Sequence, residues 1–456
     1  MNKLTFAIIA TTFVTALHAQ NGVNSPYSRY GFGIQSERAM GFNKGMGGVA
    51  QGFRNGQQIN MANPASYSAV DSVTALFDMG ITFQNSNYKM GNLQQNIRNA
   101  SFDYFAFQFR AFRHVGMTIG LLPVTNIKYD FSSSSEKLEG TENITSSYNF
   151  NGDGGLREVI FGTGWNPFKP ISIGFNVGYI WGDYTHNMQM AFSESNAFGL
   201  KRTYSAEIST YNLQAGLQYI QPINKKDQIV LGVAYTLGHN FSNDAYRTTE
   251  ILTSDTSGDT KTNDTIKSAF HWPTSIAGGV TYYHNNTLRV GADFELQRWS
   301  GTRFPNHETG FSGSTVSETY TSTVGQLNDR IKFASGLDWT PNPLSGHYFS
   351  RCTYKVGAYY AQTYAKPDVT GVVTKKPYEI GVSAGISFPI ANAHITSIDM
   401  RKRNIPRLNM SVQWVHTNIP YLNASTMRPG TLIENYFKFC LGISFSERWF
   451  YKSKLN

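Results

Sequence analysis

Residues 75–84 read ALFDMGITFQ, and apolar side chains alternate with small, polar or charged ones along most of this stretch. Successive side chains of a β-strand point to opposite faces, so the alternation predicts a strand with one apolar face. The opposite faces of this and later strands hold glycine, amide and charged residues, which could not pack a dry core. The sequence therefore predicts strands whose apolar faces contact lipid and whose polar faces line a wet interior.

The same alternation recurs as far as residue 446 and predicts about fourteen strands, an even number as in single-chain bacterial barrels. The expected fold is all-β: a transmembrane antiparallel β-barrel over residues 72–446. Short connections should be periplasmic, whereas the long polar loops 244–267 and 301–327 should be extracellular. The predicted strands are 72–85, 98–112, 115–130, 142–166, 170–187, 203–221, 227–243, 268–284, 286–300, 328–340, 352–365, 378–389, 407–417 and 431–446.

The apolar faces carry no charge, which fixes how each strand is oriented. A charge on the lipid face near the bilayer centre would cost about 2–4 kcal/mol. A soluble β-sandwich is the alternative, but it would have to bury the charged faces or expose the phenylalanine ones. Most tryptophans fall near predicted strand ends, where the headgroup girdles of a barrel lie. The apolar faces include Phe105, Phe107, Phe109, Ile171, Ile173, Phe175, Val177, Leu288, Val290, Phe437, Phe439 and Leu441.

Composition agrees with one large β-domain. The chain has 456 residues, of which 15% are charged and 14% aromatic, and no shift in composition divides it. No run of about 18 apolar residues follows the N-terminal segment, which excludes a helical membrane protein. The net charge of +9 arises from scattered basic residues. Solvated loops and lipid headgroups explain this charge better than nucleic acid does.

The two ends of the chain lie outside the predicted barrel. Residues 1–19 combine Lys3, an apolar stretch and a small residue, Ala19, before the expected cleavage point, and so predict a signal peptide. Residues 447–456 are expected to form a periplasmic tail. Cys352 and Cys440 lie on separate, non-neighbouring predicted strands, so both are expected to be free thiols.

Residues 20–71 are glycine-rich and show no sustained alternation. About fourteen strands enclose a lumen too wide for wall side chains to fill. Glycines on the inward faces would let another backbone approach the wall closely. We therefore expect residues 20–71 to form a plug inside the barrel, the alternative being a disordered periplasmic tail. The inward glycines include Gly162, Gly164, Gly174, Gly178, Gly216, Gly232 and Gly279.

Two short motifs in this segment resemble the hatch of the FadL/TodX-type outer-membrane proteins. They are Gly45, Met46, Gly47, Gly48, Val49 and Ala50, followed by Asn63, Pro64 and Ala65. SPYSRYG at 25–31, GISF at 442–445 and RWF at 448–450 are similar to members from Bacteroidota. The resemblance implies a plugged outer-membrane barrel that carries fatty acids or aromatic hydrocarbons. The chain departs from many barrels because it continues past Phe450 instead of ending on an aromatic residue.

Two candidate sites follow. Pro123 interrupts the third predicted strand, and Gly152, Asp153, Gly154 and Gly155 interrupt the adjacent fourth strand at a similar height. Either these breaks form a lateral opening, as the FadL-type resemblance implies, or they are a bulge that bends a long strand. An apolar ligand pocket between plug and wall is expected to be lined by Phe32, Phe42, Met46 and Phe53.

No catalytic constellation stands out, and no metal or cofactor is expected. Asp293 and Glu295 share a face with Arg289 and are interpreted as lumen charges that neutralise one another. Two functions remain open. The first is passive uptake of a small hydrophobic or amphiphilic molecule through a plugged barrel. The second is a non-transporting subunit or scaffold of an outer-membrane protein secretion or assembly complex, as in the PorV-like relatives, with protein partners at loops 244–267 and 301–327.

Overall fold

The computed structural model describes residues 24–448 apart from 73, 92, 136–144, 194–197, 253–259, 286, 313–314, 368–374, 391–404 and 423–428. The predicted signal peptide and the predicted tail from residue 449 onward lie outside the described residues.

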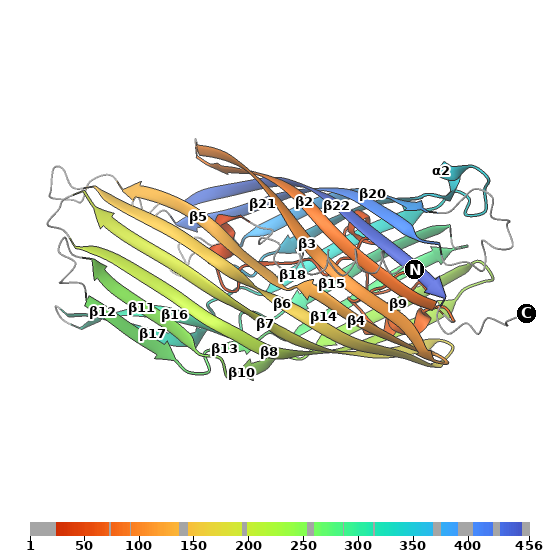
Figure 1. Cartoon of the computed structure of the whole chain (residues 1–456), viewed down its shortest axis with the longest axis horizontal. Helices are drawn as coiled ribbons and strands as arrows, with labels where there is room; N and C mark the ends of the chain where they lie inside the picture. Colours follow the sequence, from red (N-terminus) through yellow and green to blue (C-terminus); the bar gives the residue numbers. More distant parts are fainter. Residues whose placement is uncertain are drawn as a thin grey trace, which may run out of the picture.

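Fourteen antiparallel strands close into a barrel (Figure 1). Each strand pairs with the next one around the ring, and the last pairs with the first from Thr74 opposite Arg448 to Met90 opposite Leu432. This confirms the predicted fold and strand number. The wall strands are β2 (Thr74–Met90), β3 (Leu93–Phe112), β4 (Val115–Pro123), β6 (Ser146–Phe168), β7 (Ile171–Phe192), β8 (Gly199–Pro222), β9 (Asp227–Thr236), β14 (Ser275–His284), β15 (Leu288–Gln297), β18 (Arg330–Trp339), β19 (Thr353–Gln362), β20 (Tyr378–Pro389), β21 (Arg407–Leu422) and β22 (Pro429–Arg448).

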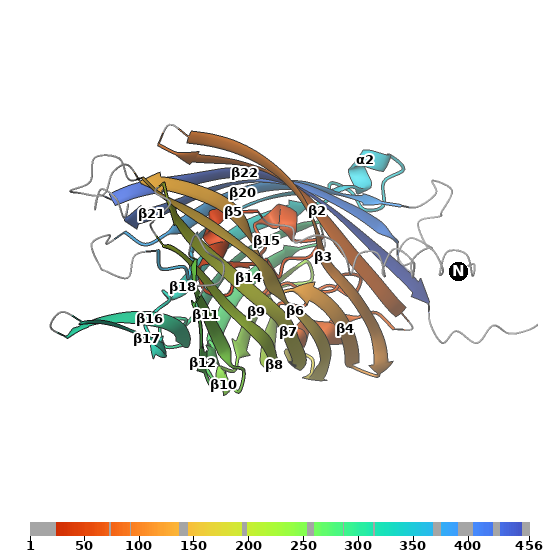
Figure 2. The same ribbon diagram turned by 60° about the vertical axis from the view of Figure 1, so that its left-hand side comes forward.

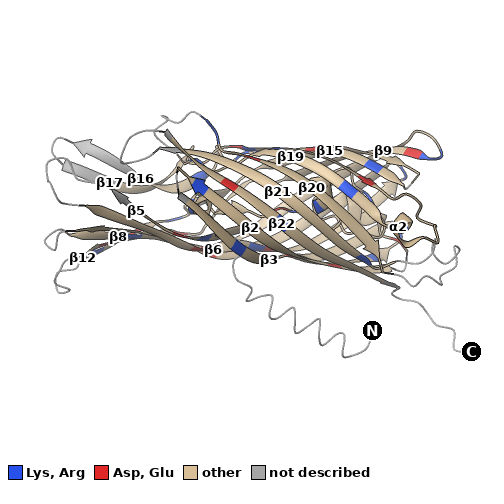
Figure 3. Cartoon of the chain, turned by 90° about the horizontal axis from the view of Figure 1, so that it is seen from above, with Lys and Arg blue, Asp and Glu red and all other residues tan. Residues whose placement is uncertain are grey.

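The wall is apolar outside and polar inside, as the alternation predicts. On β7, Phe175 and Val177 expose 56% and 55% of their surface, whereas Asn176 between them exposes 3%. The period of two side chains places every second residue in the lumen. Few Lys, Arg, Asp and Glu positions lie along the strands seen in Figure 3. The apolar belt thus faces outward around the ring.

Two of the long connections are hairpins rather than loops. Region 244–267 holds β11 (Ala245–Leu252) and β12 (Thr260–Ile266), which pair with each other. Region 301–327 holds β16 (Arg303–Ser312) and β17 (Thr315–Val324), which project beyond the ring in Figure 2. Both regions are rich in threonine, whose branched side chain favours strands. The expectation of plain loops was wrong. Outside the membrane neither face of a strand contacts lipid, so a hairpin there can have a polar sequence without alternation.

Residues 24–70, from here on called the plug, lie inside the ring of strands (Figures 1 and 2). Their elements are short: η1 (Pro26–Arg29), β1 (Ile34–Gln35), η2 (Lys44–Met46) and η3 (Pro64–Ala69). None of the described helices is long and apolar enough to cross a membrane. β5 (Thr125–Ser135) follows β4 and pairs with β6 of the wall, and the remaining elements are β10 (His239–Phe241), β13 (Phe270–Trp272) and α2 (Tyr348–Arg351).

Wall glycines let the plug backbone approach the barrel closely. A Cβ added to Gly174 would overlap Pro64, and one added to Gly336 or Gly357 would overlap the backbone of Met46. Glycine is the residue that permits such an approach of two backbones. At these positions, a single additional side-chain carbon on the wall would therefore clash with the plug. Of the glycines expected to face inward, those whose added Cβ would meet plug atoms are Gly162, Gly164, Gly174, Gly216 and Gly232.

Candidate functional site

The barrel wall splits between β3 and β5. β3 pairs with β4 from Phe112 opposite Val115 to Phe105 opposite Leu121. Two residues beyond Leu121, Pro123 ends β4, and the chain continues as β5. Among the described pairings, β5 pairs with β6 and β1 but not with β3. We call the resulting gap, above the Phe105–Leu121 pair, the slit.

The residues predicted as an opening lie at this split. β6 pairs with β4 up to Arg157 opposite Pro123, and resumes with β5 at Gly154 opposite Ile127. Between these two pairs, the three residues 124–126 of the β4–β5 segment thus face only two residues, Gly155 and Leu156, of β6. Gly154 and Gly155 have φ of +136° and +140°, a region that glycine tolerates best. The structure therefore brings Pro123 and Gly155 together at a kink, while Gly152 and Asp153 pair regularly with β5.

A bulge in β3 forms the other lip of the slit. Tyr104 lies opposite Gly80 and Phe102 opposite Ile81, so Asp103 between them is the extra residue. A bulge increases local twist and bends its strand. β3 accordingly turns away from β5 just beyond its last pair with β4. The sequence analysis missed Asp103, although Phe102 and Phe105 are three residues apart and break the period of two.

Asp103 also binds the plug. Its Oδ2 lies 2.5 Å from Lys44 Nζ and accepts a hydrogen bond from Thr82 Oγ1 at 2.6 Å. Both charged side chains are largely buried. The bulge thus anchors η2 of the plug to the lip of the slit.

The plug covers the slit from inside by pairing with β5. Ile34 and Gln35 of β1 lie opposite Asn126 and Thr125 in an antiparallel ladder. Further along β5, the Ser25 amide donates to the Lys128 carbonyl at 2.9 Å. The plug therefore takes, at the start of β5, the place that a wall strand would occupy.

A cavity of about 140 Å³ lies behind the slit. β3 contributes Asp103, and the kink contributes Pro123. Burial alone would raise the pKa of Glu37 in the plug, but Lys438, Lys332, Lys44 and Arg330 outweigh it and lower this pKa to about 2. The cavity suits a polar or amphiphilic occupant better than a hydrocarbon. Its charged lining residues are Glu37, Lys44, Asp103, Arg330, Glu379, Glu434 and Lys438.

The four residues proposed as an apolar pocket are not brought together. Phe42 and Phe53 contact each other inside the plug as a tilted pair, with their ring centroids 4.3 Å apart. Met46 is fully buried against β18 and β19. Phe32 lies elsewhere, and none of the four lines the cavity behind the slit or a second cavity beside Trp272 and Trp299. Protein atoms fill the space around each of them.

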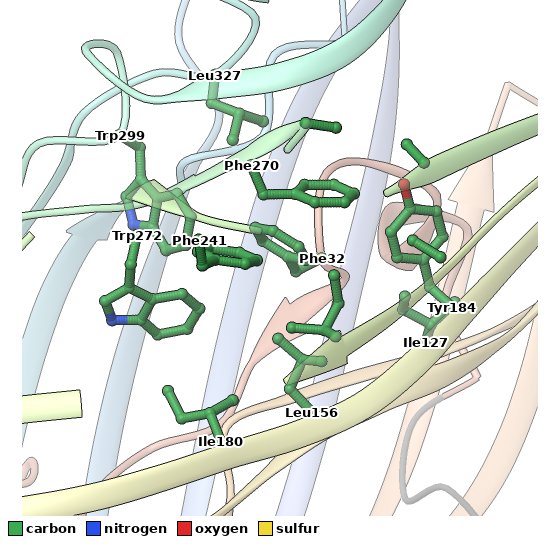
Figure 4. Packing of buried hydrophobic residues seen from close by; sticks show 14 of the residues in the cluster. Phe32, Ile127, Leu156, Ile180, Tyr184, Phe241, Phe270, Trp272, Trp299 and Leu327 are labelled. Carbon is green, nitrogen blue, oxygen red and sulfur yellow. The ribbon is translucent and has the colours of Figure 1, made fainter. Parts of the chain in front are cut away.

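Phe32 is the centre of an aromatic cluster inside the barrel (Figure 4), whose wall residues lie toward the end opposite the short turns. Its ring centroid lies 5.5 Å from that of Phe270 and 6.1 Å from that of Trp299. By the sidedness of barrel turns, this end is extracellular. Packed side chains therefore occupy part of the lumen there, and Trp272 and Trp299 of the cluster also line a cavity of about 130 Å³. The main members of the cluster are Phe32, Tyr184, Phe241, Phe270, Trp272, Trp299 and Tyr364.

The predicted plug motif fastens the plug to the wall. Asn63 caps η3 by accepting from the Ala65 amide at 3.1 Å, and its Nδ2 donates to the Gln51 carbonyl at 3.0 Å. The Gly47 amide donates to Ser383 Oγ of β20 at 2.9 Å. Pro64, Gly45 and Gly48 lie in the same two buried turns. The motif residues are therefore structural contacts between plug and wall.

The lumen charges are paired differently from the expectation. Asp293 accepts from the Ala50 and Gln51 amides at 2.6 and 2.9 Å and thus holds the plug. Arg289 pairs with Asp338 at 2.7 Å, not with Asp293 or Glu295. Within the described ranges, no three His, Cys, Asp or Glu side chains could hold a metal ion. Cys352 and Cys440 are free and buried, as expected.

Solved structures share this fold. The toluene transporter TbuX of Ralstonia pickettii matches with a TM-score of 0.55 and 14% identity, over 91% of this chain and 99% of that one. A FadL homologue of Pseudomonas aeruginosa matches with a TM-score of 0.59 and 11% identity, over 90% and 99% of the two chains. The toluene transporter TodX of Pseudomonas putida matches with a TM-score of 0.55 and 14% identity, over 91% and 99%. No curated protein matches the sequence.

The fold and its neighbours define the class: the chain has the fold of the FadL/TodX-type β-barrels. The resemblance seen in the sequence is confirmed at this level. A family model named BamG matches residues 1–456. The chain belongs to the BamG family.

Proposed function

We propose that this barrel is a non-conducting subunit that binds other proteins in an outer-membrane secretion or assembly complex. The observation that carries the proposal is the extensive packing of the plug against the wall. Phe32 of the plug packs into an aromatic cluster toward the extracellular end, and a second buried cluster joins the plug to wall strands below it. A solute entering along the barrel axis would have to displace packed aromatic rings.

The attachment of the plug supports the same proposal. Main-chain groups of the plug bind Asp293, Ser383 and the Lys128 carbonyl on three different parts of the wall. Moving the plug would break these hydrogen bonds in a buried setting, where an unsatisfied polar group costs about 1–3 kcal/mol. A plug held in this way is suited to stiffening a scaffold.

The comparisons leave room for the proposal. The BamG family model spans the whole chain, and the toluene transporters TbuX and TodX, which would favour uptake, are only 14% identical to it. Identity this low supports a shared fold without a shared solute. The two extracellular hairpins, β11–β12 and β16–β17, offer surfaces for partners.

Uptake of a small molecule is the second candidate, and the slit with its cavity is the observation that favours it. Pro123, Asp103 and the plug all line the same cavity. The charged lining favours an amphiphilic molecule with a polar head over a plain hydrocarbon. The slit would then be the lateral exit that was expected at Pro123 and Gly152, Asp153, Gly154 and Gly155.

Affinity purification from native membranes in mild detergent tests the choice. We expect other proteins to remain bound in fixed stoichiometry, measured by native mass spectrometry. A variant in which residues 304–323 are replaced by a short Gly-Ser turn keeps the ring of strands and tests the β16–β17 hairpin as a contact. A monomer that retains an amphiphile in its cavity would contradict the scaffold and support uptake.

A further inference from the structure

One edge of β3 has no partner strand over eleven residues. From Leu93 to Asp103, β3 pairs on one side with β2. On its other side, pairing with β4 starts only at Phe105. Within the described part of the chain, no strand pairs with this edge over residues 93–103. Alternate residues of an antiparallel strand direct both N–H and C=O to the same side. About half of these residues therefore present their backbone groups to the slit.

β5 cannot close the gap, because the plug already covers the start of its facing edge. β1 pairs with Thr125 and Asn126, and Ser25 and Ser28 hydrogen-bond to the backbone of Lys128. Figures 1 and 2 show the β2–β3 hairpin standing clear of β5 at its tip. The plug thus keeps the two lips of the slit apart and leaves the edge of β3 exposed.

The lower part of this edge lies at the level of the lipid belt. Ala100 is opposite Phe83, which exposes 47% of its surface. On the neighbouring strand β22, Phe437 exposes 52% of its surface. It lies opposite Asn85, which is two residues beyond Phe83 on β2. Backbone groups facing lipid without a partner cost several kcal/mol each. The edge of β3 therefore requires an occupant with complementary hydrogen-bonding groups.

The side chains along the edge favour a polypeptide over a lipid chain. The strand carries amides and hydroxyls that an acyl chain could not satisfy. Residues 93–103 carry Arg98 and Asp103, and Asp103 is already paired with Lys44 of the plug. Arg98, with Lys89 on the neighbouring strand β2, therefore leaves a basic edge. Like charges placed opposite each other across a strand pair are destabilising, whereas opposite charges stabilise it. The polar side chains of β3 in this region are Gln94, Gln95, Asn96, Arg98, Asn99 and Ser101.

We propose that residues 93–103 of β3 are a strand-addition site for an extended, net-acidic segment of a partner protein. The barrel already uses this mode within the same slit, where β1 of the plug adds to β5. Main-chain hydrogen bonds supply the affinity in such additions, and alternate side chains supply the specificity. This inference rests on the proposed scaffold function and names the kind of surface that the partner uses.

Hydrogen exchange of the backbone amides tests the site directly. The native complex, the isolated barrel in detergent and the isolated barrel in lipid nanodiscs are compared by mass spectrometry. We expect alternate amides of 93–103 to exchange at least about tenfold more slowly in the complex than in either isolated form. Residues 171–180 of β7 are paired on both sides and serve as the control, with unchanged exchange.

Proline substitution separates main-chain from side-chain binding. Ala100 and Ser101 are neighbours, so the N–H of one faces the slit and the N–H of the other faces β2. Of A100P and S101P, one is expected to lower partner recovery about tenfold while the barrel keeps its heat-modifiable migration in gels, because proline removes a single donor. Q94A and N96A should leave recovery unchanged, and R98E should lower it severalfold.

The outcomes are distinguishable. Protection that already appears in lipid alone, or only in a homodimer, would assign the edge to lipid or to a second copy and overturn the proposal. Partners that remain bound to both proline variants, with fast exchange at 93–103, would overturn it while leaving the scaffold function in place. Purification of a bare monomer would overturn both.

Discussion

At the scale of single residues, two wall glycines set the position of the plug. Gly336 on β18 and Gly357 on β19 both face the backbone of Met46. Protein interiors are packed so closely that one additional carbon forces neighbours to move. The Met46–Gly47 turn can therefore occupy its place only because these two positions lack a side chain.

G357A should displace this turn and destabilise the barrel. The added Cβ would overlap Met46 and the Gly47 amide, and overpacking of this kind costs typically 1–3 kcal/mol. Urea unfolding in detergent micelles measures the loss, and limited proteolysis reports the loosened plug. G278A is the matched control, since the nearest atom to its Cβ would be 3.8 Å away. Equal stability of the two variants would argue against the close approach.

The ionisation of Glu37 should make the plug sensitive to acid. Its pKa is lowered from 4.5 to about 2 because four cations outweigh the effect of burial. A lowered pKa means that this contribution is fully present above about pH 4.5, and it is lost as the pH falls toward 2. It amounts to roughly 3 kcal/mol at neutral pH.

The difference in unfolding free energy between the wild type and E37Q measures this contribution. We expect the difference to be largest at pH 6 and to shrink steadily between pH 4.5 and 2. Lys438, whose Nζ lies 3.8 Å from Glu37 Oε1, is the nearest of these cations. If the difference in unfolding free energy between the wild type and E37Q does not change with pH, the four cations do not stabilise the Glu37 carboxylate.

At the scale of elements, the kink between β4 and β5 depends on the conformation of one glycine on β6. Gly155 has φ of +140°, and a Cβ there would lie 2.6 Å from the Thr125 carbonyl oxygen. G155A should therefore cost roughly 1–3 kcal/mol of stability. Thermal unfolding followed by gel shift checks this loss. G301A, with nothing near its Cβ, should be neutral. Full stability of G155A would mean that the kink relaxes freely.

The sequence was sufficient to predict the ring of strands but not the slit. Alternation along β2 or β7 is obligatory, because each second residue faces lipid and the others face the lumen. Pro123 and the glycines of β6 marked the kink, since they alter the backbone itself. The bulge at Asp103 changes only the register between β2 and β3. Its one sign in the sequence is that Phe102 and Phe105 are three residues apart instead of two.

The candidate ligand pocket could not be predicted for a related reason. Phe32, Phe42, Met46 and Phe53 belong to a coil without periodicity, so their mutual positions depend on the path of the plug. That path is determined by contacts with distant strands, such as Asp293 with Ala50 and Ser383 with Gly47. Hydrophobicity placed the four side chains in the interior but did not indicate which neighbours they would meet.

At the scale of the whole molecule, the plug occupies much of the lumen. Deletion of residues 24–70 should raise the conductance of the barrel, because fourteen strands enclose more space than wall side chains fill and Phe32 would be lost from the aromatic cluster. Conductance of single molecules in planar bilayers measures this, and the intact protein should show no steady current. A steady current through the intact protein would contradict the non-conducting subunit.

The close fit between plug and wall also dictates an order of assembly. Glycines that receive the plug lie on strands from β4 around to β22, so the plug is surrounded on nearly every side. The seam between β2 and β22 joins the two ends of the ring. Contacts between such distant parts of a chain form slowly during folding. We therefore expect β2 and β22 to pair only after the plug has bound to the wall. A barrel that closed earlier would leave the plug outside its lumen.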